Sequence, residues 1–226
     1  MGKTKILIWD LPTRIFHWLL AASFLGAFVT AESERWRNVH VTLGYTMLGL
    51  IGFRLIWGVI GTRYARFSSF AFGPRSVARY LKSLLSRSPQ HHLGHNPAGS
   101  WAIYALLATA IVTGLSGYLT YSDIGGDWLA ELHEGAGNAM LAVVFVHIAG
   151  VVVSSFLHRE NLAAAMVNGR KAGRSGEGIR YRHRIVAVLL VLATLGFWGG
   201  GADYLGAISG SAPEAATARS HVAHQN

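Results

Sequence analysis

The chain has 226 residues, of which 51% are hydrophobic and only 14% are charged, and its mean hydropathy is positive at +0.34. This composition is typical of an integral membrane protein that forms one compact bundle. The formal net charge of +9 is segregated between loops, so it indicates membrane orientation and argues against nucleic acid as a partner. Cysteine is absent, which excludes disulfides, thiolate metal sites, iron–sulfur clusters and covalent c-type haem attachment.

The N-terminus combines Lys3 and Lys5 with an apolar run, as a signal peptide does. Pro12, Arg14 and His17 interrupt this run and no persuasive cleavage site follows. We therefore predict a retained helix rather than a cleaved leader.

Five segments are long enough to cross a membrane, which takes about 20 residues. They are expected at 11–31, 40–60, 100–121, 133–157 and 185–206. The fold class predicted from them is an all-α integral membrane protein. Its parts are a bundle of four transmembrane helices within residues 1–160, a basic cytoplasmic linker over 161–184, a fifth transmembrane helix over 185–208 and a disordered periplasmic tail over 209–226.

Basic residues are confined almost entirely to one set of loops. Sixteen of the twenty belong to the N-terminal segment, the loop after the second span and the stretch after the fourth: Lys3, Lys5, Arg14, Arg63, Arg66, Arg75, Arg79, Lys82, Arg87, Arg159, Arg170, Lys171, Arg174, Arg180, Arg182 and Arg184. Segment 122–134 instead carries four acidic residues and no base. By the positive-inside rule this predicts a bacterial inner-membrane protein with a cytoplasmic N-terminus and a periplasmic C-terminus.

Segment 76–86, SVARYLKSLLS, lies within the basic loop after the second span. It is either an amphipathic helix on anionic headgroups or an irregular loop.

Two histidines of the fourth span share one helix face. His133 and His147 are fourteen residues apart, a rise of about 21 Å and a rotation that leaves them within about 40° of each other. Ionisable side chains at such depth are usually functional. We expect each to bind a haem iron.

Depth decides which histidines can share an iron. His17 lies near the cytoplasmic start of the first span, at the level of His147, whereas His40 begins the second span on the periplasmic side, at the level of His133. The predicted pairs are therefore His17 with His147 and His40 with His133. Two opposed imidazoles leave four equatorial positions for a porphyrin, and the helices offer no carboxylates or thiolates for a bare metal. A proton relay through the histidines is the alternative.

Arg54 lies fourteen residues after His40 on the same face, level with the cytoplasmic pair. A guanidinium there needs an anion, and a haem propionate would serve; the alternative is that Arg54 snorkels to the headgroups. His91, His92 and His95 could bind a metal, but a solvated loop is the preferred interpretation.

Several stretches resemble the bacterial cytochrome b561 family and the related b-type cytochrome subunits of nickel–iron hydrogenases. They are PTRIFHWLL around His17, VHVTLGYTMLGLIGFRLIWGVIGTRYARFSSF from His40 through Arg54, GHNPAGS before the third span, and ELHE with VHIAGVVVSSFLHREN around His133 and His147. The resemblance covers roughly residues 8–171. It implies a four-helix bundle with two b haems, each ligated by two histidines that match His17, His40, His133 and His147. It also implies electron transfer between the quinone pool and a partner such as a c-type cytochrome or a dehydrogenase.

The chain departs from the family pattern in its fifth hydrophobic stretch, which could pack against a partner subunit, support a homo-oligomer or anchor the tail. Two other functions stay open: a stand-alone quinone reductase or superoxide oxidase, and a haem-free proton channel or transporter. The colour of the purified protein and its turnover with quinone alone distinguish the three.

Overall fold

The computed structural model describes residues 4–86 and 89–201. Within them, four helices are long and apolar enough to cross a membrane. They are α1 (Leu11–Thr30), α2 (Arg37–Ile60), α4 (Pro97–Tyr121) and α5 (Trp128–His158). The four-helix membrane bundle predicted from the sequence is therefore confirmed.

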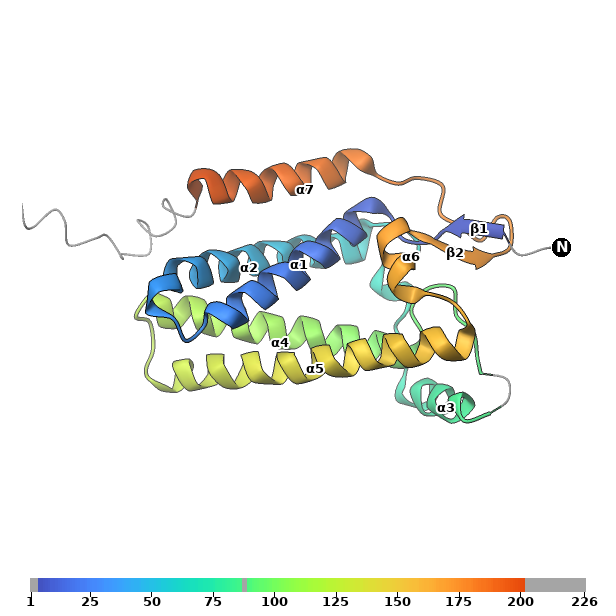
Figure 1. Cartoon of the computed structure of the whole chain (residues 1–226), viewed down its shortest axis with the longest axis horizontal. Helices are drawn as coiled ribbons and strands as arrows, with labels where there is room; N and C mark the ends of the chain where they lie inside the picture. Colours follow the sequence, from blue (N-terminus) through green and yellow to red (C-terminus); the bar gives the residue numbers. More distant parts are fainter. Residues whose placement is uncertain (1–3, 87–88, 202–226) are drawn as a thin grey trace, which may run out of the picture.

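The four long helices form two antiparallel pairs, α1 with α2 and α4 with α5, which pack on each other through α2 and α4 (Figure 1). Buried apolar side chains fill the centre of this bundle: Met47 and Ile51 from α2, Ala110 from α4 and Met140 from α5. Most of the remaining apolar surface faces outward, as a lipid environment requires.

Capping residues set the start of two helices. Asp10 precedes α1, and its Oδ1 accepts a hydrogen bond from the Thr13 amide at 2.7 Å. Asn96 precedes α4, and its Oδ1 accepts from the Gly99 amide at 2.7 Å. Each cap is followed by a proline in the first helical turn, where the missing N–H costs nothing.

One end of the bundle carries a small folded cap that the sequence did not predict. Strand β1 (Thr4–Leu7) pairs antiparallel with β2 (Arg170–Gly173), and α6 (Leu162–Asn168) lies beside them (Figure 1). Ile8, Trp9, Tyr64 and Ala165 form the core beneath. The segment predicted as a linker over 161–184 is therefore partly folded. Strands of four residues are too short to show a recognisable alternation.

The basic loop after α2 forms the helix α3 (Pro74–Leu84). Tyr80 is buried, whereas Leu81 and Leu85 are exposed on another face. The segment is therefore helical and the irregular loop is wrong, while its place on anionic headgroups stays a prediction.

The last described element is α7 (Arg184–Gly196), which continues as a short π-helix, Phe197–Gly201. It packs along α1 (Figure 1), and the indole N–H of Trp198 donates to the Thr46 hydroxyl at 2.9 Å. This apolar helix is shorter than the four spans, so the described residues contain only part of the predicted fifth transmembrane helix over 185–208. The tail predicted over 209–226 lies outside the described residues.

Candidate functional site

Two of the singled-out histidines face each other near the end of the bundle where α1 joins α2. His40 lies in the first turn of α2 and His133 near the start of α5, and their ring centres are 5.9 Å apart with planes at 83°. Both side chains are half-buried. We name His40 and His133 the outer pair.

Each ring of the outer pair is held by a main-chain carbonyl of a neighbouring helix. His40 Nδ1 lies 2.8 Å from the Ala27 oxygen on α1, and His133 Nδ1 lies 2.8 Å from the Thr113 oxygen on α4. A carbonyl oxygen only accepts, so each Nδ1 must carry the proton. The lone pair is then on Nε2, which is free to bind a metal, and the carbonyl fixes the ring orientation.

The inner pair is formed by His17 of α1 and His147 of α5, nearer the end with the β-strands. Their ring centres are 6.5 Å apart with planes at 52°. The His17 ring also packs edge-on against Trp18, with the two ring centres 5.0 Å apart. The Nδ1 atom of His17 is buried and has no hydrogen-bond partner among the described residues. The structure thus brings together both pairs that the sequence predicts, and none of these four rings contacts a ring at the other level.

The spacing of both pairs suits ligands on opposite faces of one iron. Two metal–nitrogen bonds of about 2 Å each hold the imidazole centres about 6 Å apart. Space for a planar group is also present: Gly44, four residues after His40, and Gly150, three after His147, have no atom within 4 Å of where a Cβ would stand. The residues therefore fit haem.

A bare metal site finds no support in the described part of the chain, which has no group of three or more histidine, cysteine or acidic side chains able to hold an ion. His91, His92 and His95, for which the sequence left a metal site open, do not form such a group.

Arg54 is only 4% exposed, so it does not snorkel to the membrane surface. Its guanidinium lies over the Phe67 ring at 4.6 Å, and its Nη1 atom is buried without a hydrogen-bond partner among the described residues. The cation–π contact stabilises the charge only in part. An anion that accepts a hydrogen bond from Nη1 would satisfy this buried donor and balance the charge of the guanidinium.

Asp10 is a buried acid close to Arg54 that sequence analysis did not consider, because it precedes α1 rather than lying within a span. Its Oδ2 accepts from the Trp57 indole at 3.2 Å and from the Thr62 hydroxyl at 2.5 Å. Its carboxylate is thus already engaged, and it forms no ion pair with Arg54 within 4 Å.

Sequence analysis considered His95 only as part of a solvated loop or a metal site, and the prediction of a solvated loop is wrong for it. Its ring lies between Trp9, at 4.6 Å, and Phe70, at 4.5 Å. Burial, followed by the positive charge of Arg54, lowers the pKa of His95 from 6.5 to about 3, so the imidazole is neutral. The signal available in the sequence was GHNPAGS, since the Asn96 cap fixes the residue before it at the mouth of α4.

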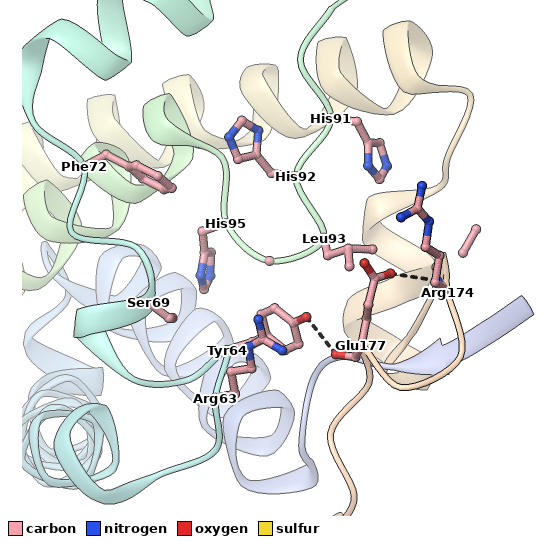
Figure 2. Close-up of a pocket in the computed structure, with 13 residues that line it drawn as sticks. Arg63, Tyr64, Ser69, Phe72, His91, His92, Leu93, His95, Arg174 and Glu177 are labelled. Atoms are coloured by element: carbon pink, nitrogen blue, oxygen red, sulfur yellow. Dashed lines mark hydrogen bonds between the residues drawn. The ribbon is translucent and has the colours of Figure 1, made fainter. Parts of the chain in front are cut away.

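The loop that carries His91, His92 and His95 also lines a cavity of about 560 Å³ at the capped end of the bundle (Figure 2). His92 and His95 lie on one side of it, and Tyr64 donates across another side to the Glu177 carbonyl at 2.8 Å. His91 stands apart at the edge, 3.6 Å from Glu160. Arg63 and Arg174 give this cavity a cationic rim.

Comparison with known proteins identifies the family. The family model of prokaryotic cytochrome b561 matches residues 8–169, which include α1 to α6, both histidine pairs and Arg54. Relatives named as probable Ni/Fe-hydrogenase B-type cytochrome subunits are similar over most of the chain. Those from Azotobacter vinelandii, Bradyrhizobium diazoefficiens and Rhizobium leguminosarum bv. viciae are 23%, 21% and 20% identical, over 74%, 77% and 77% of this chain and 88%, 89% and 92% of their own.

No solved structure matches the chain. The family match covers well over half of the sequence and every helix that bears a candidate ligand. The chain therefore belongs to the prokaryotic cytochrome b561 family, multi-pass membrane cytochromes of the b type.

Proposed function

We propose that this protein carries electrons across the bacterial inner membrane through two b haems. His17 and His147 would ligate the haem on the cytoplasmic side, and His40 and His133 the haem on the periplasmic side. The observation that supports this most strongly is that α5 presents His133 and His147 at two levels, each opposite a partner ring at 5.9 or 6.5 Å.

The side of each pair follows from the distribution of charge. The capped end of the bundle contains β1, α3 and β2, with most of the basic residues, whereas the α4–α5 connection contains Asp123 and Asp127 and no base. The positive-inside rule predicts that the capped end lies in the cytoplasm and that the inner pair lies on the cytoplasmic side of the membrane.

The histidines of this chain would fill both axial positions of each iron, which favours electron transfer over oxygen binding. Haem supplies one-electron redox chemistry when it is bound. Ala27 and Thr113 keep the imidazoles of the outer pair in the Nδ1–H tautomer and raise their basicity through the hydrogen bonds they accept. The surrounding apolar helices exclude water.

Arg54 would neutralise a propionate of the inner haem. Its buried Nη1 has no partner in the described chain, and it lies on the cytoplasmic half of α2, level with the inner pair. A cation at that position favours the reduced form and raises the midpoint potential.

The electrons would pass between the quinone pool and a redox partner, either a c-type cytochrome or a dehydrogenase. The names of the relatives make a nickel–iron hydrogenase the first dehydrogenase to test. The outer face of α7 offers lipid-exposed apolar side chains, such as Val188, Leu192 and Leu195, for contact with such a subunit or with a second copy.

The deciding experiment is a pyridine haemochrome assay on the detergent-purified protein, with near-infrared magnetic circular dichroism to identify axial ligands. We expect two b haems per chain, both low-spin with two nitrogen ligands. One haem, or a haem with another axial ligand, would contradict the paired arrangement. A colourless protein would contain no haem and would instead favour the interpretation of the histidines as a proton pathway.

A further inference from the structure

Two buried nitrogen atoms near the inner pair have no hydrogen-bond partner among the described residues: Nη1 of Arg54 and Nδ1 of His95. They come from different segments, since Arg54 is in α2 and His95 precedes α4. Both side chains contact Phe70, whose ring centre lies 6.0 Å from the Arg54 guanidinium carbon and 4.5 Å from the His95 ring. The two unsatisfied nitrogen atoms therefore lie around one aromatic ring.

The two side chains are held rigidly. Trp9 and Phe70 pack on the imidazole of His95, and Phe67 packs on the guanidinium of Arg54. Burying a polar nitrogen without a partner is unfavourable, and fixing its side chain prevents it from finding another. Such a pair of fixed donors is suited to an acceptor that is bound between them.

The nearest histidines of the bundle are those of the inner pair. His95 lies near this pair: burial contributes most to its lowered pKa, and Arg54, His147 and His17 contribute as well. The acid nearest Arg54 is Asp10, whose two carboxylate oxygens already accept from Thr13, Trp57 and Thr62. The carboxylate nearest to Arg54 is therefore not a free acceptor, and among the described residues neither nitrogen has a partner.

We propose that His95 and Arg54 together bind a single propionate of the inner haem, His95 through Nδ1–H and Arg54 through Nη1–H. This inference rests on the proposed function, and it adds His95 as a cofactor-binding residue that acts on the haem from its edge rather than on the iron. The positive charge of Arg54 and the hydrogen bond donated by the neutral His95 both offset the negative charge of the carboxylate, so they raise the midpoint potential of the inner haem. His95 also lines the cavity of Figure 2.

The test compares His95→Leu, His95→Gln, Arg54→Leu and the double variant with the wild-type protein. His92→Leu is the matched control, because His92 lies three residues away in the same loop. It is likewise packed against aromatic rings, at 5.7 Å from Phe72 and 5.6 Å from Tyr80, and its buried Nδ1 also lacks a partner. Two readouts are used: the midpoint potential of each haem, and the propionate bending bands of the resonance Raman spectrum.

We expect His95→Leu and Arg54→Leu each to lower the inner midpoint potential and shift one propionate band, with the outer potential unchanged. The double variant should shift the potential by less than the sum of the single variants, because both donors act on one carboxylate. His95→Gln, which keeps an N–H donor, should restore part of the shift, and His92→Leu should leave both haems as in the wild type.

An inner potential and propionate bands unchanged in His95→Leu would overturn the proposal, as would additive shifts, which would mean two separate acceptors. If His95→Leu does not retain the inner haem, the His95→Gln variant distinguishes the two explanations. Wild-type properties in His95→Gln would support a hydrogen-bond donor role for His95, and loss of the inner haem from His95→Gln as well would contradict it. A wild-type protein without haem would instead refute the proposed function itself, so the two failures are distinguishable.

Discussion

The imidazole of His133 on α5 is hydrogen-bonded to the main chain of α4, with its Nδ1 atom 2.8 Å from the carbonyl oxygen of Thr113. That carbonyl is reachable because residue 117, one turn further along α4, is glycine. A Cβ at Gly117 would stand 2.6 Å from His133 Cε1 and 2.7 Å from Nδ1. His40 uses a different opening, since Ala27 is in the last turn of α1, where carbonyls lack main-chain partners within the helix; the Ala27 oxygen also accepts from the Thr30 hydroxyl at 3.2 Å.

Gly117→Ala should therefore displace the His133 ring and break its bond to Thr113. The added methyl group cannot be accommodated by a flexible neighbour, because the atoms it meets belong to a rigid ring. We expect the outer haem to be lost or weakly bound, with a haem content near one per chain and an unchanged inner potential. Haemochrome analysis and redox titration measure both quantities.

Gly49→Ala is the control for this substitution. Gly49 is also in the middle of a transmembrane helix, but it is exposed and a Cβ there would have no neighbour within 4 Å. Two haems retained in both variants would mean that the ring of His133 does not need the space at Gly117.

Removing one histidine from each level of α5 tests the pairing directly. We expect His133→Ala to lose the outer haem and His147→Ala to lose the inner haem, each leaving one b haem with its own midpoint potential. The two remaining potentials should reproduce the two of the wild-type titration. Loss of both haems from either variant, with the protein still folded by circular dichroism, would show that the levels are not independent.

Much of this arrangement follows from elementary geometry. The rise of an α-helix fixes the depth difference between His133 and His147, and loop charge fixes which ends of α1 and α2 lie at each level. Span length then identifies the four long helices, because a lipid environment imposes a minimum apolar length. The pairing in space was predictable for these reasons.

Other features depend on contacts that no local pattern encodes. The β1–β2 pair joins segments more than 160 residues apart and only four residues long. Asp10 is fully buried and the ring of His95 packs between Trp9 and Phe70 through contacts between segments that are distant in the sequence. α7 has the composition of a span but packs over α1 with a shorter described helix, and hydropathy alone does not reveal that.

Asp10 joins the start of α1 to the end of α2, and Asp10→Asn should destabilise the protein. Its Oδ1 caps α1, while Oδ2 accepts from both Trp57 and Thr62, and the residue is fully buried. An amide can match only one of these two roles, so a buried donor is left without an acceptor, at a cost of about 1–3 kcal/mol. We expect a lower apparent Tm, followed through haem absorbance at a fixed scan rate because unfolding in detergent is often irreversible.

Asp127→Asn serves as the comparison, since Asp127 stands at the start of α5, is exposed and makes no capping hydrogen bond with its side chain. Its apparent Tm should equal that of the wild type. An equal Tm for Asp10→Asn would show that the network contributes little to stability.

The orientation in the membrane can be tested cleanly because the chain contains no cysteine. Glu34, in the α1–α2 connection, and Ser175, after β2, are both exposed and lie at opposite ends of the bundle. In spheroplasts, a membrane-impermeant maleimide should label Glu34→Cys, while Ser175→Cys should react only after the membrane is disrupted. The reverse pattern would put the capped end in the periplasm and would exchange the sides assigned to the two histidine pairs. It would leave the pairs themselves intact, because their geometry does not depend on which side is which.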